Sequence, residues 1–504
     1  MRSTYKRSAG GGTKTRASIP VVPRYQTELA PATKQHIVGL ATSLLRQKPN
    51  LAAVSPFGDE VRCGIGTGIG VFIGDQSEIP LYAPPEDNHL QYRMAFLADS
   101  NDLLVLGETP SPAFEQYLCQ LLHMPHLNVL NTAEPEHLNR TSVAERCLDN
   151  PSHFQQICEL ARSSGQMTIV PYLTTGHIWR LAGAVSKTAA VPVFVAGPPP
   201  KLSNLANNKV WFSDRIRDLF DVRGPRSNYA VYGLSALTRR VKFLADRSTK
   251  VIVKIPDSAG SAGNIALEAA YIRNVPAPLL HEHLAETLRF LGWNGTFPLL
   301  AEVWETPVVS SPSVQMWIPL KDDGPPVVEG IFEQVVEGEL GEFVGARQAQ
   351  LPDAWQDRLT TEGAQIAFLL QQLGYFGRCS FDAIIAGNDF ADGLLHWIEC
   401  NARWGGVSIP MTLANRLAGA ATPLETVIVQ RKHRPVTPRS FRDVLKDFGG
   451  SMFTPGQSRE GIVFLTPHLL ETGAGSHFLT LAATTARATE IALKVQRRLT
   501  DPRD

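Results

Sequence analysis

The sequence lacks an excess of charge of either sign. Lysine plus arginine and aspartate plus glutamate both number 48 among 504 residues, so the formal net charge at neutral pH is zero. Proteins that bind nucleic acid or an anionic membrane surface through general electrostatics carry a surplus of positive charge. We therefore expect no nucleic acid and no membrane among the partners of this chain.

Long apolar runs and paired cysteines are also missing. No apolar stretch approaches the ~20 residues that a membrane-spanning helix needs. The six cysteines, at positions 63, 119, 147, 158, 379 and 400, include no C-x-x-C pair and form no framework typical of a small secreted protein. These absences predict a soluble protein of the reducing cytoplasm, in which Cys400 packs in the core.

Two common nucleotide-binding loops are absent as well. The glycine-rich stretch 63–70 has no G-x-G-x-x-G spacing, so a turn or an oligomer contact is a better interpretation than a dinucleotide loop. The small-residue loop that follows Lys254 is not a Walker loop, because its lysine precedes the glycines. A nucleotide site in this chain must therefore be of another kind.

Two neighbouring segments carry the residue types of a metal site. Alternation along 397–401 puts Glu399 and Asn401 on one strand face, because strand side chains repeat with period two. Asp382 lies in an apolar run that indicates the neighbouring strand. Two carboxylates and an amide oxygen form the ligand set that Mg²⁺ prefers, usually completed by substrate phosphates and water. The sequence thus predicts a magnesium and nucleotide site at Asp382, Glu399 and Asn401.

A second segment has the chemistry of a phosphate-binding loop. The β-branched run 251–253 ends at Lys254, and small residues follow it. Small residues let backbone N–H groups approach phosphate oxygens, while the ammonium group neutralises their charge. The loop residues expected to contact the nucleotide are Ser258, Gly260, Ser261 and Gly263.

The order of these features resembles that of the ATP-grasp ligases. A lysine strand, a small-residue loop, an acidic hinge strand, Asp382 and then Glu-x-Asn-x-Arg-x-Gly-Gly follow one another between about 207 and 420. The resemblance implies ATP and Mg²⁺ as cofactors, with Lys209 and Lys254 as the two ATP lysines. It also implies a hinge at 299–305, where the chain meets adenine and ribose. The hinge residues expected to bind the nucleotide are Glu302, Trp304 and Glu305.

The flanks resemble the peptide ligases of the pheganomycin type, which serve natural-product biosynthesis. The segments 196–202 and 448–452 carry this narrower resemblance. Those enzymes join a guanidine-bearing, nonproteinogenic amino acid to a peptide amine. The implied partners are a small amino-acid acid substrate and an amine or peptide acceptor. The sequence leaves the oligomeric state open, a homodimer included.

The implied reaction is the formation of an amide bond. A substrate carboxylate attacks the terminal phosphorus of ATP, and an amine displaces phosphate from the acyl phosphate, leaving ADP. Lys254 and Arg403 are the catalytic candidates, Arg403 because a guanidinium can hold two oxygens of the transferring phosphoryl group or of the oxyanion. The residues expected to contact substrate are Gly405, Gly406, Arg378 and Arg347.

Two other functions fit the same residues. One is an ATP-grasp ligase of another branch that makes a small-molecule amide, and the other is a nucleotide-binding regulatory protein without turnover. A binding module has no evident need of Arg403, which favours an enzyme. Phosphate release that depends on an amine acceptor would separate a ligase from a sensor.

The hydrophobic pattern predicts a multidomain fold, first α/β and then α+β. Strand signals at 103–106, 167–170 and 191–195 alternate with helix signals such as 153–163, which is typical of a parallel sheet. The expected units are a disordered basic tail (1–24), a pre-ATP-grasp α/β domain (25–206), an ATP-grasp lid (207–300), a catalytic subdomain (301–435) and an α+β extension (436–504). In the extension we expect a strand at 461–465 and a long helix at 478–499.

Overall fold

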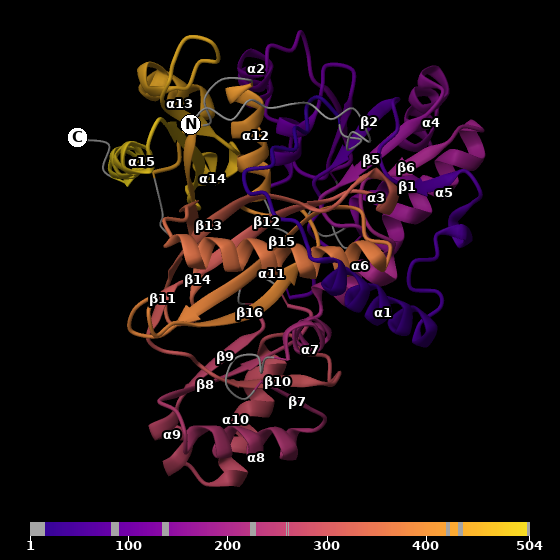
Figure 1. Ribbon diagram of the computed structural model, residues 1–504. Helices are drawn as coiled ribbons and strands as arrows, with labels where there is room; N and C mark the ends of the chain where they lie inside the picture. The colour runs from indigo at the N-terminus through magenta and orange to yellow at the C-terminus, as the bar shows by residue number, and fades with distance from the viewer. Residues whose placement is uncertain are drawn as a thin grey trace.

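The computed structural model describes residues 16–81, 90–133, 141–221, 228–258, 260, 262–419, 424–431 and 437–500. In these ranges the chain forms a parallel N-terminal sheet, a small antiparallel sheet and a long antiparallel sheet, so the predicted fold class is confirmed. Figure 1 shows the small sheet and its helices projecting from the rest of the molecule, at the bottom of the view. None of the described helices is long and apolar enough to cross a membrane.

The N-terminal sheet has the strand order β1-β6-β5-β2-β3-β4, with every pair parallel. Its strands are β1 (Val61–Cys63), β2 (Ile69–Ile73), β3 (Leu103–Leu106), β4 (Asn128–Asn131), β5 (Met167–Pro171) and β6 (Val193–Val195). The helices of this region are α1 (Pro31–Gln47), α2 (Pro112–Leu121), α3 (Val143–Asp149), α4 (Pro151–Ser164) and α5 (Gly176–Ala189), with short 3₁₀ turns η1 (Ser55–Phe57) and η3 (Gln91–Leu97). The strands predicted near 103, 167 and 193 and the helix predicted at 153–163 are confirmed by β3, β5, β6 and α4.

The strand order reverses between β2 and β5. From β2 the chain continues to β3 and β4 on one side, and then returns to β5 and β6 on the other. The main-chain N–H of Tyr172, which follows β5, donates to the carbonyl oxygen of Ile73 at the end of β2 (2.8 Å). In open α/β sheets, ligands bind in the crevice outside the carboxyl ends of the strands at such a reversal.

Residues 16–24 are packed against the folded molecule, so the predicted disordered tail is wrong for this stretch. Ile19 is fully buried, and Arg16 forms an ion pair with the buried Asp102. The main-chain N–H of Val22 donates to the Glu329 carboxylate (3.1 Å). The stretch is ordered because its apolar residues pack in the core. The basic composition of the segment gave no indication of this packing. Residues 1–15 of the predicted tail lie outside the described residues.

The small antiparallel sheet forms a unit with its own hydrophobic core, which we call the lid (229–303). Its strands, in the order β7-β10-β8-β9, are β7 (Tyr229–Val231), β8 (Lys250–Lys254), β9 (Asn264–Glu268) and β10 (Leu299–Val303), and its helices are α8 (Leu234–Ala245), α9 (Ala269–Asn274) and α10 (Ala277–Phe290). Helix α10 buries Leu280, Leu284 and Leu288, which are three residues of an apolar stripe with helical spacing. Before the lid lie α6 (Pro200–Asn207) and α7 (Lys209–Phe220), which contact the long sheet at β16. The lid therefore begins later than the expected residue 207.

The long antiparallel sheet has the order β11-β15-β12-β13-β14-β17-β19-β18, and β16 also pairs with β15. Its strands are β11 (Val308–Ser310), β12 (Pro312–Ile318), β13 (Val327–Glu337), β14 (Glu342–Gln348), β15 (Gly377–Ala386), β16 (Leu394–Asn401), β17 (Glu425–Arg431), β18 (Gly461–Phe464) and β19 (Ser476–Ala482), with a 3₁₀ turn η5 (Lys321–Asp323). Helix α11 (Asp353–Gln372) contacts β12 and β13 and buries Ile366, Leu369 and Leu370. Gly374 follows α11 with a φ of 94°, a backbone conformation that suits glycine.

The C-terminal segment, predicted as an appended α+β extension, adds its strands to the long sheet. The expected strand near 461 is confirmed by β18, but residues 476–482 form strand β19, which pairs with β17 along seven residues. The helix predicted at 478–499 begins only at α15 (Thr485–Thr500). Pairing with β17, which is distant in the sequence, stabilises strand β19. The local sequence pattern does not predict this pairing. The other helical elements here are α13 (Phe441–Phe448), η6 (Gly449–Ser451) and α14 (His468–Glu471).

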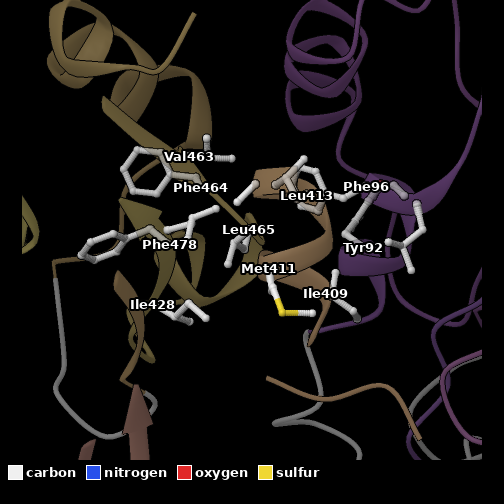
Figure 2. Packing of buried hydrophobic residues seen from close by; sticks show 14 of the residues in the cluster. Tyr92, Phe96, Ile409, Met411, Leu413, Ile428, Val463, Phe464, Leu465 and Phe478 are labelled. Atoms are coloured by element: carbon white, nitrogen blue, oxygen red, sulfur yellow. The ribbon is translucent and has the colours of Figure 1, made fainter. Parts of the chain in front are cut away.

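One large hydrophobic core joins the N-terminal region, helix α12 (Ser408–Ala418) and the C-terminal strands. Figure 2 shows Tyr92 and Phe96 on one side of α12 and Val463, Phe464 and Phe478 on the other. We call everything outside the lid the body. Because its regions share this core, we expect the body to behave as one rigid platform.

Candidate active site

A cavity of about 1140 Å³ lies between the lid and the body. The lid contributes Lys254 and Glu302, and the long sheet contributes Asp382 and Glu399. Residues from the N-terminal region and from the C-terminal segment complete the walls, among them Arg93. Every part of the fold therefore meets at this cavity, which makes it the candidate active site.

The three predicted metal ligands converge in the cavity. Strands β15 and β16 are antiparallel, and Asp382 stands opposite Glu399 in the register. The Asn401 side-chain N–H donates to an Asp382 carboxylate oxygen (2.8 Å), and the amide oxygen of Asn401 accepts from Arg403. All four side chains line the cavity. Cys400, between two of them, is buried on the other strand face, as predicted.

The two carboxyl groups of this set are held in different states. Burial and the neighbouring Glu399 charge raise the pKa of Asp382 to about 6, against hydrogen bonds from Ser313 and Gln334. Burial alone would raise the pKa of Glu399, but the ammonium of Lys209, with Arg403 and Lys254, outweighs it and lowers that pKa. Two buried acids side by side are costly, and a cation between them would remove that cost.

Each predicted ATP lysine is paired with an acid of the cavity. Lys209 Nζ lies 3.1 Å from a carboxylate oxygen of Glu399 and also donates to the carbonyl oxygen of Ser258. Lys254 Nζ donates to Glu302 (2.7 Å) across the paired strands β8 and β10, where both side chains are mostly buried. A polyanionic ligand could replace these carboxylates as the partner of both ammonium groups.

The hinge residues also face the cavity. Glu302, at the end of β10, lines it together with Trp304 and Glu305. The Trp304 ring is flanked by the ammonium of Lys250, 4.9 Å from the ring centroid. An aromatic ring and acidic groups beside a strand end can receive the base and hydroxyl groups of a nucleoside.

Some residues of the small-residue loop line the cavity, and others hold the loop in its conformation. Gly260 lines the cavity. Ser258 is buried, and its hydroxyl donates to the carbonyl oxygen of Ile255 (2.8 Å). Gly263 stands so close to Ser258 that an added Cβ would lie 2.4 Å from its side chain. Ser258 and Gly263 thus shape the loop, and Ser261 lies outside the described residues.

Sequence reasoning missed the residues that hold the metal set in place. The Ser313 hydroxyl on β12 donates to Asp382 (2.6 Å), and Gln315 donates to Ser313 (2.8 Å). The Asn207 side-chain oxygen accepts from the main-chain N–H of Ala402 (3.0 Å). These residues come from elements far away in sequence, so only the pairing of β12 with β15 brings the first two to the site.

Beyond Arg403, Gly405 and Gly406 also line the cavity. A Cβ on Gly406 would lie 3.1 Å from the Phe343 ring and 3.2 Å from the Gln430 side chain, so this approach requires a small residue. The bidentate ion pair of Arg431 with Glu337 lies on the same wall (2.8 and 2.7 Å).

Comparison with known proteins identifies the fold. Residues 91–186 match the pre-ATP-grasp domain family, and no curated protein sequence matches the chain. Among solved structures, the ADP complex of an N5-carboxyaminoimidazole ribonucleotide synthetase is similar over 86% of this chain and 98% of its own, with 13% identity and a TM-score of 0.51. The β-γ-ATP complex of the Campylobacter jejuni biotin carboxylase is similar over 85% of this chain and 91% of its own, with 13% identity and a TM-score of 0.51.

A third structure, the biotin carboxylase domain of the Hydrogenobacter thermophilus 2-oxoglutarate carboxylase, was solved as a dimer with MgADP, ADP and bicarbonate. It covers 86% of this chain and 90% of its own, with 12% identity and a TM-score of 0.51. The chain has the ATP-grasp fold. The residues that match the pre-ATP-grasp domain include strands β3, β4 and β5 of the N-terminal sheet, and both the lid and the long sheet line the cavity.

Two predicted substrate contacts lie outside the residues that line the cavity. Arg378 is fully buried, forms an ion pair with Glu329 and lies between the rings of Trp317 and Trp404, so its prediction as a substrate ligand is wrong. Burial lowers the pKa of Arg378 to about 9. Arg347 is exposed on β14 and lies outside the residues that line the cavity, so that prediction is also wrong.

Proposed function

We propose that this protein is an ATP-dependent carboxylate–amine ligase that forms an amide bond through an acyl phosphate and releases ADP and phosphate. The observation that carries the proposal is the convergence of Lys209, Lys254, Asp382, Glu399 and Arg403 on one cavity. The combination of two ammonium groups, two acids and a guanidinium group matches the charges of a nucleoside triphosphate, a divalent cation and a transferring phosphoryl group.

The residues of the metal set fit Mg²⁺. Two carboxylates and an amide oxygen are hard oxygen ligands, and the raised pKa of Asp382 marks a place where negative charge lacks compensation. Asp382, Glu399 and Asn401 would hold the ion, which supplies charge neutralisation for the phosphates. Within the described residues, no group of three or more His, Cys, Asp and Glu offers an alternative metal site. That the similar structures were solved with ADP, β-γ-ATP or MgADP supports a nucleotide at this cavity.

Each side chain has a task in the proposed reaction. Lys209 and Lys254 bind phosphate oxygens, and in doing so they exchange their present partners, Glu399 and Glu302, for the nucleotide. Arg403 stabilises the charge of the transferring phosphoryl group and then the oxyanion formed when the amine attacks. Gly405 and Gly406 leave space for the substrate backbone. No protein nucleophile is needed, because the acyl phosphate is the activated species.

We propose a peptide or amino acid as the amine substrate, with an amino-acid carboxylate as the acid. This finer assignment rests on the resemblance to the pheganomycin-type ligases. A ligase that makes a small-molecule amide is the alternative.

The test combines nucleotide analysis with product detection. The protein is incubated with ATP, Mg²⁺ and pairs of amino acids and peptides, and the nucleotides are separated by chromatography. ADP, an amide product, and a hydroxamate when hydroxylamine replaces the amine are the expected results. AMP as the product would contradict the acyl-phosphate route, and ADP that forms without any amide would contradict the assignment of amino acids and peptides as substrates.

A further inference from the structure

One cationic side chain of the cavity has no task in the proposed reaction. Arg93 lies on η3 of the N-terminal region, is 1% exposed and lines the cavity. Its Nε donates to the carbonyl oxygen of Leu90 (3.2 Å), whereas its Nη1 has no hydrogen-bond partner among the described residues. A buried guanidinium nitrogen without an acceptor is costly unless a ligand supplies one.

The neighbouring acid does not fully neutralise Arg93. That acid is Glu108, which interacts electrostatically with Arg93 and accepts a hydrogen bond from the main-chain N–H of Tyr92 (3.1 Å). Burial raises the pKa of Glu108 to about 8, although Arg93 and the backbone hydrogen bonds oppose that rise. At neutral pH, Glu108 is therefore mostly protonated, and Arg93 retains an excess of positive charge.

The position of Arg93 connects it with the acyl-transfer end of the cavity. Its guanidinium lies 5.5 Å from the centroid of the Tyr172 ring. The carbonyl oxygen of Tyr172 accepts from the main-chain N–H of Trp404 (3.0 Å), which lies between Arg403 and Gly405. Tyr172 also marks the reversal of the N-terminal sheet, where β5 meets β2, and both Tyr172 and Ile79 line the cavity.

Arg93 is also held by a rigid support. Figure 2 shows its neighbours Tyr92 and Phe96 packed beside Ile409 and Leu413 of α12. All seven residues of η3 are buried. A binding group on such a support is fixed before the ligand arrives, which lowers the entropic cost of binding.

We propose that Arg93 binds the free carboxylate of the amine substrate, which is therefore an amino acid or a peptide with an unblocked C-terminus. This inference rests on the proposed ligase function. The carboxylate of the acid substrate is consumed at Arg403 when it becomes the acyl phosphate, so a second permanent cation in the same cavity suits a carboxylate that does not react. A guanidinium can hold both oxygens of that group.

The test compares matched ligands and matched arginines. Dipeptides and their C-terminal amides, such as Ala-Ala and Ala-Ala-amide, are measured as acceptors by initial rates and as ligands by saturation-transfer NMR. The wild-type protein should prefer the free acid by about ten- to a hundredfold in KM or Kd. Arg93→Gln should lose this preference without changing the KM for ATP. Arg93→Lys, which keeps the charge without the planar fork, should retain part of it.

The exposed Arg62, which pairs with Glu60 at the protein surface, provides the control variant Arg62→Gln. This variant should keep the full preference. Equal use of acids and amides by the wild-type protein, or an unchanged preference in Arg93→Gln, would overturn the inference. Arg93-dependent binding of ribose 5-phosphate in place of the peptides would overturn the carboxylate assignment.

Binding and turnover separate the two proposals. Arg93-dependent binding of the acids, together with a failure to form amide, would refute the ligase and keep the carboxylate site. Amide formation that does not depend on Arg93 would support the ligase and refute the carboxylate site. If Arg93→Gln melts at a clearly lower temperature, Arg93→Lys and the comparison of acid with amide in the wild-type protein decide the question.

Discussion

The lid and the body contribute to one cavity but are built in different ways. The lid has a small core of its own, whereas the body shares a large core between its N-terminal sheet, α12 and the C-terminal strands. Figure 1 shows the lid projecting away from these layers. The body carries the proposed metal set and Arg403, and the lid carries Lys254 and the small-residue loop. We infer that the body fixes the reaction geometry, whereas the lid supplies groups that can move toward the nucleotide.

The lid and the body also differ in how the charged groups at the cavity are neutralised. In the lid, Lys254 is neutralised locally by Glu302 on the adjoining strand. In the body, Glu399 is held by Lys209, and Asp382 remains short of positive charge. Hydrogen bonds join the two parts near the cavity, among them those that Lys209 donates to the carbonyl oxygens of Ser258 and Pro256. The nucleotide would add a second, much stronger connection between them.

The largest effect should come from the body. Glu399→Gln removes one charge from the metal set without a change in volume, so ADP formation should fall by about a hundred- to a thousandfold. Initial rates of ADP release and the melting temperature measure activity and folding together. Glu286→Gln, on an exposed part of α10, is the control. Near-normal activity in Glu399→Gln would remove this residue from the site.

A smaller effect should come from the lid. Lys254→Met removes a phosphate ligand and leaves the buried Glu302 without its partner, so the KM for ATP should rise by about ten- to a hundredfold and stability should fall. The double variant Lys254→Met with Glu302→Gln should regain stability but not ATP affinity. Recovery of both quantities in the double variant would show that Lys254 serves only its ion pair.

The smallest effect should be on stability and should again arise in the body. Burial raises the pKa of Glu108 from 4.5 to about 8, so the folded state holds this proton more firmly than the unfolded state does. The stabilisation is complete below about pH 4.5 and is lost as the pH rises through about 8. Glu108→Gln should therefore gain melting temperature relative to the wild type at pH 9 but not at pH 4. A difference that is independent of pH would contradict this account.

Local patterns were sufficient to predict the centre of the site. Glu399 and Asn401 share a face because of strand alternation alone, and the apolar run around Asp382 made the neighbouring strand recognisable. The lysine at the end of β8 and the glycines after Arg403 could likewise be found from order and spacing, and they line the same cavity.

Contacts between distant segments could not be predicted. An arginine such as Arg378 is a residue type that often binds substrate, so the sequence suggested that role. Its contacts with Glu329, Trp317 and Trp404 form only in the folded protein. Arg93 lies in a segment without a motif, and its position depends on how η3 packs on α12. Strand β19 follows the same rule, because its pairing with β17 prevails over local helical preference.

Hydrogen exchange with and without an ATP analogue and Mg²⁺ tests most directly whether the lid and the body share one nucleotide site. The account predicts slower exchange both in lid peptides spanning 250–268 and in body peptides spanning 377–386 and 394–406. In Glu399→Gln, protection of both regions should be weaker. Protection that is confined to one region, or absent from both, would contradict a nucleotide site shared between lid and body.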